Sequence, residues 1–147
     1  MRLVLDAEAV NALMDANHPA ERRVRGAVEA ARRLRRDVVI PTVTLAELYR
    51  GASRSKWLDG LLAREHGDGM LLRDTDRQLA RLVGAVLSEA GAGSDLLADA
   101  HAVAVAVEAG GGVVMTADEP DLARLAAPYR TVVVESVDGG KRARRRH

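Results

Sequence analysis

The sequence contains no cysteine and no phenylalanine, and only 2% of its 147 residues are aromatic. Without cysteine the chain can form no disulfide, no thiolate nucleophile and no zinc–thiolate site, which fits a reducing cytoplasm. The shortage of aromatic side chains disfavours a nucleic-acid surface built on base stacking, so arginine would have to bind any polyanion. No apolar run approaches the roughly 18 residues of a membrane span. We therefore expect a soluble, cytoplasmic protein with no membrane partner.

Charge is distributed unevenly along the chain, although the formal net charge is only +1. The last seven residues, 141–147, hold five of the 22 lysines and arginines and no acid, which leaves 17 basic against 21 acidic residues elsewhere. We expect residues 138–147 to be a disordered basic tail, either solvated or in contact with phosphates. Seven arginines between residues 22 and 36 likewise predict a solvated helix face or a phosphate-contacting ridge.

Short apolar runs alternate with helical patterns along the whole chain. The runs predict strands at 3–6, 37–40, 70–72, 113–115 and 131–134. The helical patterns cover 7–16, 19–36, 42–51, 53–65, 75–90 and 95–108, with a last helix beginning within 116–122. An apolar run that passes directly into a helix is typical of a strand buried on both faces. Because hairpin signals are missing, the pattern indicates one α/β domain with a mainly parallel sheet.

Two acids directly follow predicted strands. Asp6 ends the first apolar run and Asp118 follows the run at 113–115. In open α/β sheets ligands bind beyond the carboxyl ends of the strands, so both side chains should reach one edge of the sheet. The alternative role of Asp6 is that of an N-cap for the following helix.

Further acids lie within predicted helices. Asp95 and Asp99 are four residues apart and share one helix face. Asp95 fits an N-cap or first-turn acid, whereas Asp99 lies in an apolar segment where a lone carboxylate would be costly without a partner or a metal. Glu47 follows Thr44 by three residues, which fits a capping box that closes its own helix start. Its alternative role is a carboxylate directed towards Asp6.

Carboxylates that converge without cysteine favour a hard cation bound by oxygen. The four histidines are scattered along the chain, so Mg²⁺ or Mn²⁺ fits the ligand set better than zinc. Such an ion would offset the repulsion among the acids, polarise a phosphoryl oxygen and activate water.

Four segments that carry these acids resemble the PIN-domain nucleases, and among them the VapC-type toxins of bacterial toxin–antitoxin pairs. The segments are VLDAEAV at 4–10, TLAEL at 44–48, DAHAVA at 99–104 and VMTAD at 114–118. They occur in the order of the family, and the resemblance covers nearly the whole chain. It implies a three-layer α/β/α PIN-like domain over residues 1–137 with a central, mainly parallel five-stranded sheet.

The resemblance also implies a site and its cofactor. The residues that match the acids of the family, as ligands of Mg²⁺ and as catalytic groups, are Asp6, Glu47, Asp99 and Asp118. Asp95 and Asp121 are possible auxiliary acids. Thr116 matches the small hydroxyl residue before the last acid, whereas Glu8 replaces the Ser or Thr that the family often has two residues after the first Asp.

The function implied is hydrolysis of RNA phosphodiester bonds by metal-activated water, in the toxin of a type II toxin–antitoxin system. The resemblance further implies a homodimer and a cognate antitoxin on a separate chain. The apolar cluster Trp57, Leu58, Leu61 and Leu62 fits a dimer contact. One alternative is a Mg²⁺-dependent phosphatase of the haloacid dehalogenase type, although that class usually has a second Asp where this chain has Glu8. The other alternative is a catalytically silent PIN-like module that binds RNA or protein.

Overall fold

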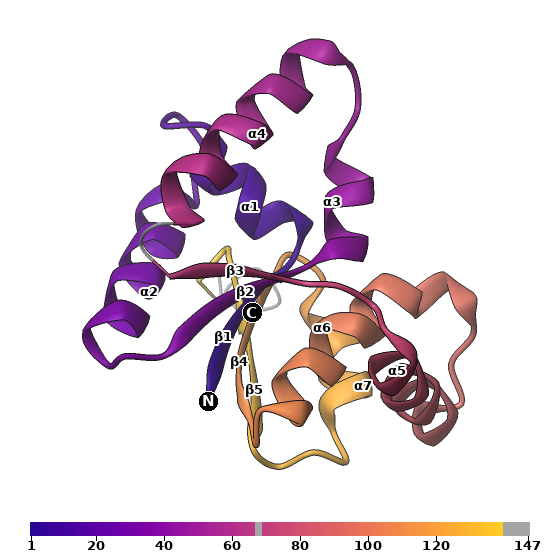
Figure 1. Cartoon of the computed structure of the whole chain (residues 1–147). Coiled ribbons are helices and arrows are strands. Elements are labelled where there is room, and N and C mark those ends of the chain that lie inside the picture. Colours follow the sequence, from indigo (N-terminus) through magenta and orange to yellow (C-terminus); the bar gives the residue numbers. More distant parts are fainter. Residues whose placement is uncertain (67–68, 140–147) are drawn as a thin grey trace, which may run out of the picture.

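A parallel sheet forms the centre of the protein in the computed structural model, which describes residues 1–66 and 69–139 (Figure 1). Its five strands are β1 (Arg2–Leu5), β2 (Asp37–Pro41), β3 (Met70–Arg73), β4 (Gly112–Thr116) and β5 (Val132–Ser136). The strand order is β3-β2-β1-β4-β5, and every pairing among these strands is parallel. The predicted fold class is therefore confirmed. Most of the predicted basic tail, from residue 140 onward, lies outside the described residues.

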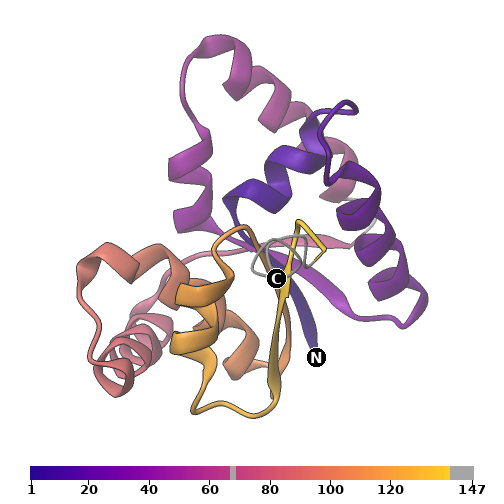
Figure 2. The same cartoon turned by 180° about the vertical axis from the view of Figure 1, so that it is seen from behind.

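Helices cover both faces of the sheet. They are α1 (Ala7–Met14), α2 (Glu21–Arg33), α3 (Thr42–Leu48), α4 (Ala52–His66), α5 (Arg77–Ala90), α6 (Leu97–Glu108) and α7 (Glu119–Ala126), with a 3₁₀ turn η1 (Ser94–Leu96) before α6. Figures 1 and 2 show α1, α2 and α4 on one face and α5, α6 and α7 on the other. Throughout residues 1–66 and 69–139, no helix combines the length and the apolar character needed to cross a bilayer.

The central strand β1 supplies side chains to two separate cores. Leu3 and Leu5 pack in the core beneath α1, α2 and α4, together with Val10 of α1. Val4 lies between them in the sequence, faces the other way and packs with Val103 of α6. Burial on both faces explains why the strand is a continuous apolar run rather than an alternating one.

The start and end of α3 differ from the prediction. Pro41 is the N-cap, no side-chain cap hydrogen bond forms, and Thr44 lies inside the first turn with its side chain buried. The predicted capping box of Thr44 and Glu47 is therefore wrong, because Thr44 already has helical backbone and cannot occupy the capping position. The helix also ends at Leu48 instead of continuing to Gly51, whose positive φ of 85° separates α3 from α4.

The apolar cluster of α4 is divided between the core and the surface. Leu58 and Leu61 are buried in the core of their own subunit, and Leu62 packs partly against it. Only Trp57 remains largely outside, with 64% of its surface exposed. This cluster therefore gives much less support to a dimer contact than the sequence pattern does.

Candidate metal centre

The four predicted acids line one pocket at the carboxyl edge of the sheet. Asp6 follows β1, Asp118 follows β4, Glu47 lies in α3 and Asp99 in the first turn of α6. Together with Glu8, Thr44, Ala7, Ala98 and Ala102 they enclose about 220 Å³. The three alanines are small, which leaves room between the carboxylates. The structure therefore brings together residues that are far apart in the sequence.

Asp6 is both a helix cap and a bridge to β4. Its Oδ1 accepts a hydrogen bond from the backbone N–H of Ala9 at 2.9 Å, which caps α1. Its Oδ2 accepts one from the N–H of Ala117 at 3.1 Å. The two roles considered for Asp6 are thus compatible, because a carboxylate has lone pairs left after accepting these bonds.

Thr116 joins Asp6 to Asp118. Its side chain is fully buried, donates a hydrogen bond to the Asp6 carboxylate and accepts one from the N–H of Asp118 at 2.8 Å. The hydroxyl therefore fixes the carboxylate of one acid and the backbone of the other. Asp118 is the N-cap residue of α7, but its side chain makes no capping hydrogen bond.

Among the residues that the structure describes, Asp99, Asp118 and Asp121 form a close group of acids. One oxygen from each lies within 4.8 Å of the others, a spacing at which a single cation could contact all three. Asp121 is in the first turn of α7, where its spacing of three from Asp118 places both on one helix face. The sequence left open whether Asp121 or Asp95 joins the site. The structure brings in Asp121, whereas Asp95 is an exposed residue of the 3₁₀ turn and lies outside this group. Asp6 and Glu47 line the same pocket as Asp99 and Asp118 but also lie outside the group of three.

The crowding of acids has an electrostatic consequence at Asp99. Burial, and then the neighbouring charges of Asp118, Asp6, Asp121 and Glu47, raise the pKa of this carboxyl to about 7. Burial also raises the pKa of Asp6, although the hydrogen bonds from Ala9, Thr116 and Ala117 oppose the shift. Such a group of carboxylates is stabilised by a bound cation, since the like charges otherwise repel each other.

The chemistry of the donors selects the type of cation. All the acidic side chains offer carboxylate oxygen, the chain has no cysteine, and the buried His101 is committed to the backbone oxygen of Leu97 at 2.8 Å. A set of oxygen ligands suits a hard divalent ion such as Mg²⁺ or Mn²⁺. The residues present therefore fit the metal that the sequence predicts.

Glu8, which departs from the family pattern, is held at the edge of the pocket. His18 Nδ1 accepts the N–H of Ala20 at 3.0 Å, so the other ring nitrogen carries the proton that Glu8 Oε1 accepts at 2.6 Å. Glu8 Oε2 accepts a bond from the Asn11 amide at 3.3 Å. The His18 hydrogen bond is the main reason that the pKa of Glu8 is lowered. Glu8 is thus an ionised carboxylate that is held in place by hydrogen bonds. In the sequence, the only sign that Glu8 lies beside the site is its position two residues after Asp6.

The comparisons with known proteins agree with this arrangement. A family model described as PIN domain matches residues 3–128. The chain belongs to the PIN domain family. Its fold is similar to that of a chain in the crystal structure of VapBC2 from Rickettsia felis bound to a DNA fragment from their promoter. That match has a TM-score of 0.61 and 17% identity over 92% of this chain and 98% of the other.

A second similar structure is that of FitAB bound to the IR36 DNA fragment. The TM-score is 0.63 with 18% identity, and the match covers 92% of this chain and 94% of the other. At these identities the two structures establish the shared fold. No match was found among the curated proteins.

Proposed function

We propose that this PIN-domain protein is a Mg²⁺-dependent endoribonuclease and the toxin of a type II toxin–antitoxin system. The observation that carries the proposal is the convergence of Asp6, Glu47, Asp99 and Asp118 on one pocket. The PIN family match and the similarity to structures named VapBC2 and FitAB support it. The nuclease unit is proposed to span residues 1–137.

In this proposal the acids hold the ion and the rest of the site holds the acids. Asp6, Asp99 and Asp118 are the proposed ligands, and the exposed Glu47 completes the set from α3. Asp121, whose carboxylate lies within 4.8 Å of those of Asp99 and Asp118, is proposed as an additional ligand. When bound, the ion polarises the phosphoryl oxygen and lowers the pKa of water, so no side chain has to act as the nucleophile. The Thr116 hydroxyl fixes the Asp6 carboxylate relative to the backbone of Asp118.

RNA would reach this acidic site through arginines around it. Several arginines of α2 have other partners: Arg25 pairs with Glu21, Arg32 pairs with Glu65, and Arg23 donates to the backbone of Ser136. Arg33, Arg35 and Arg36 lie at the end of α2 and just before β2, at the amino edge of the sheet and opposite the pocket. The proposed phosphate contacts are therefore the exposed Arg22, at the start of α2, and Arg50. Arg50 donates to the backbone oxygen of Glu47 at 3.0 Å, which fixes its guanidinium near the site.

The decisive experiment is RNA cleavage with Mg²⁺ and with a chelator, followed by mapping of the 5′ and 3′ ends. The full chain should cleave only with the metal. Asp99→Asn should be inactive, and Asp95→Asn is the matched control because it removes a carboxylate of the same segment from outside the acidic group. Binding of RNA without cleavage would identify a silent module. Release of phosphate from p-nitrophenyl phosphate without RNA cleavage would favour the phosphatase.

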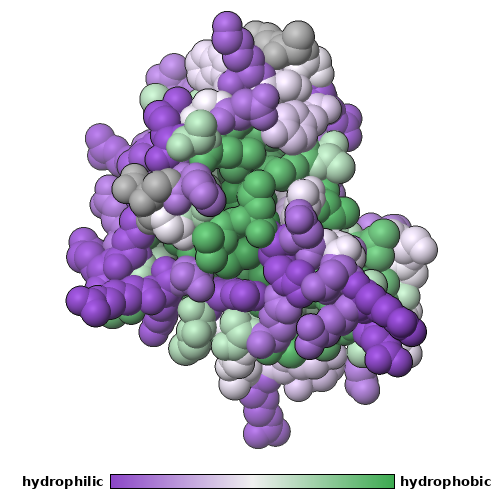
Figure 3. All heavy atoms as spheres, viewed as in Figure 1, coloured by the Kyte–Doolittle hydropathy of each residue, from purple (hydrophilic) through white to green (hydrophobic). Residues whose placement is uncertain are grey.

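The proposed partners are a second copy of the chain and an antitoxin on a separate chain. Figure 3 shows apolar side chains gathered in a hollow framed by α3, α4 and β3. On the edge strand β3, Leu72 is 46% exposed and is in register with Ile40, so it faces the side of the sheet that carries α1 and α4. Leu71, which is 38% exposed, faces the opposite side. A partner chain would cover the hollow. Sedimentation at micromolar concentration tests the dimer, and a purely monomeric chain would contradict it.

A further inference from the structure

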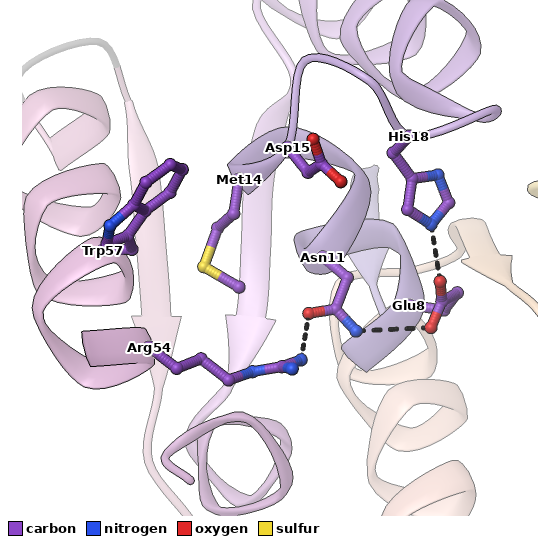
Figure 4. Close-up of a pocket in the computed structure, with 7 residues that line it drawn as sticks. All are labelled: Glu8, Asn11, Met14, Asp15, His18, Arg54 and Trp57. Carbon is purple, nitrogen blue, oxygen red and sulfur yellow. Dashed lines mark hydrogen bonds and ion pairs between the residues drawn. The ribbon is translucent and has the colours of Figure 1, made fainter. Parts of the chain in front are cut away.

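A second and larger pocket shares a wall with the metal centre. It encloses about 550 Å³ between α1 and α4 and is lined by Glu8, Asn11, Met14, Asp15, His18, Arg54 and Trp57. Figure 4 shows Trp57 and Arg54 extending from α4 towards the side chains of α1 and the loop that follows it. Glu8 lines both this Trp57 pocket and the metal pocket. A strand of RNA that crosses the metal centre therefore has the Trp57 pocket directly beside its path.

Trp57 gives this pocket an aromatic wall. It is the only tryptophan of the chain, and 64% of its surface is exposed, although its neighbours Leu58 and Leu61 are buried. An indole face left open to solvent offers a platform on which any nucleobase can stack, an interaction of about 1–3 kcal/mol per base by alanine substitution. The low aromatic content excludes an extended stacking surface, but one base needs only one ring.

Arg54 gives the pocket a positive charge. Its guanidinium donates to the amide oxygen of Asn11, a neutral group, and within residues 1–66 and 69–139 it forms no ion pair within 4.0 Å. Its charge does act on the nearby Glu8 carboxylate and helps to lower the pKa of that group. Asn11 is held in turn by its bond to Glu8. Arg54 is thus fixed in place while several of its five N–H donors remain for an anion such as a phosphate.

The carboxylates of the pocket are hydrogen-bond acceptors, so they would favour a base that carries a hydrogen-bond donor. Asp15 Oδ1 accepts the N–H of Asn17 at 2.9 Å, which fixes this exposed carboxylate at the end of α1. A carboxylate accepts hydrogen bonds from exocyclic amino groups, such as N4 of cytosine. Adenine, cytosine and guanine carry such a group and uracil does not.

We propose that the Trp57 pocket binds one nucleotide of the RNA substrate beside the scissile phosphate, with its base on Trp57, its phosphate on Arg54 and an amino group on Asp15. This inference rests on the proposed ribonuclease function. It makes the pocket a specificity site that favours amino-bearing bases over uracil. A protein partner is less well supported, because the guanidinium of Arg54 still has N–H donors for an anion and because Glu8 lines both this pocket and the pocket of the proposed cleavage site.

Fluorescence of the single tryptophan reports on this site directly. In the full-length Asp99→Asn protein with Mg²⁺, octaribonucleotides of adenine or cytosine should quench Trp57 saturably, and oligouridylate should bind more weakly. Adding Arg54→Gln should lower the affinity and reduce the slope of log K against log salt by about 0.7. Lys56→Gln is the matched control, since it removes an exposed charge of the same helix outside the pocket.

Steady-state kinetics of the active protein provide the second test. Trp57→Ala should raise KM for RNA by about 5- to 150-fold and leave kcat nearly unchanged, and Trp57→Phe should restore part of the loss. Because Trp57 is mostly exposed, both variants should keep the melting temperature of the parent.

The results separate this inference from the function on which it rests. If RNA is cleaved but Trp57 is not quenched and Trp57→Ala keeps the parental KM, the nucleotide site is overturned and the ribonuclease stands. If an arginine-rich peptide quenches Trp57 and RNA does not, the pocket is a protein contact and the inference is likewise overturned. If the full chain cleaves no RNA with Mg²⁺, the proposed function itself fails.

Discussion

Helix α6 carries a carboxylate near each end, and the two lie in opposite environments. Asp99, near its start, faces four other acids, and its pKa is raised to about 7 by burial and by their charges. Glu108, at its end, accepts hydrogen bonds from Arg2 at 2.6 Å and from Arg73 at 2.8 Å, and these bonds lower its pKa. The Glu108 carboxylate has its hydrogen-bond partners within the fold, whereas the ionised Asp99 carboxylate would be stabilised by a bound cation. This difference separates a structural acid from a candidate functional one.

The largest expected effect is the loss of activity in Asp99→Asn. If the proposed function is correct, removing this ligand should lower kcat for RNA cleavage by more than about a hundredfold, because a metal centre contributes several kcal/mol to the transition state. Glu108→Gln should keep the parental rate, since Glu108 lies outside the metal pocket. Both variants should give the circular dichroism spectrum of a folded α/β protein. Equal rates for the two variants would remove the functional distinction between the ends of α6.

The next effect is the dependence of stability on pH and Mg²⁺. The folded-state pKa of Asp99 lies above its usual value of 3.8. In the metal-free protein, the contribution of Asp99 to the free energy of unfolding is therefore fully present below about pH 4. That stability is lost as the pH rises through about 7, because the ionised form is disfavoured in the fold. Mg²⁺ at a hundred times its Kd should restore about 2.7 kcal/mol at pH 8.

At pH 5 the ion has to displace the proton of Asp99, so the same Mg²⁺ concentration should stabilise the protein less. Thermal denaturation at both pH values, with and without the metal, measures the difference. Asp99→Asn should flatten the pH profile of the metal-free chain. A stabilisation by Mg²⁺ that is the same at both pH values would contradict the assignment of Asp99 as a ligand.

The positions of the strands could be predicted from the sequence, because burial on both faces leaves a continuous apolar run. The five predicted strands agree with the observed ones to within two residues, and Asp6 and Asp118 come to one edge as parallel topology requires. Asp99 could be identified because an acid within an apolar helix needs a partner. These features depend on local pattern, which the sequence displays directly.

Other features depend on how elements meet, and the sequence does not display that. Thr44 and Glu47 match a capping box, but Pro41 takes the N-cap and places Thr44 inside the helix. Asp121 enters the acidic group only because of how α7 follows β4. The bond between Glu8 and His18 depends on the turn between α1 and α2. Such contacts follow from tertiary geometry that no local motif encodes.

A smaller effect is expected on the stability of Glu108→Gln. The substitution leaves Arg2 and Arg73 without their shared carboxylate, and the side chains of all three residues are only 20–22% exposed. Partly enclosed, charge-assisted hydrogen bonds of this kind contribute about 1–3 kcal/mol when broken. Urea denaturation should show this loss with an unchanged m value. Glu89→Gln, on the exposed surface of α5, should cost no more than about 0.5 kcal/mol.

The smallest effect should come from Arg25→Gln, which removes a single ion pair within one helix whose arginine lies open to solvent. Arg25 and Glu21 are one helical turn apart on α2, and their Nε and Oε1 atoms are 2.5 Å apart. The arginine side chain is 46% exposed and the glutamate side chain 18%. Pairs of this kind contribute about 0.3–0.5 kcal/mol because water screens the charges and both side chains lose freedom. The loss in Arg25→Gln should therefore disappear in about 1 M salt, where the Debye length falls to about 3 Å.

The loss in Glu108→Gln should persist at that salt concentration, since the bonds from Arg2 and Arg73 are partly shielded from solvent. Urea denaturation of both variants at low and high salt measures the contrast. Equal salt sensitivity would mean that the pairing at Glu108 is no different from an ordinary surface pair. In that case the contrast between the two ends of α6 would rest on Asp99 alone, because Glu108 would then be stabilised no more than any exposed glutamate.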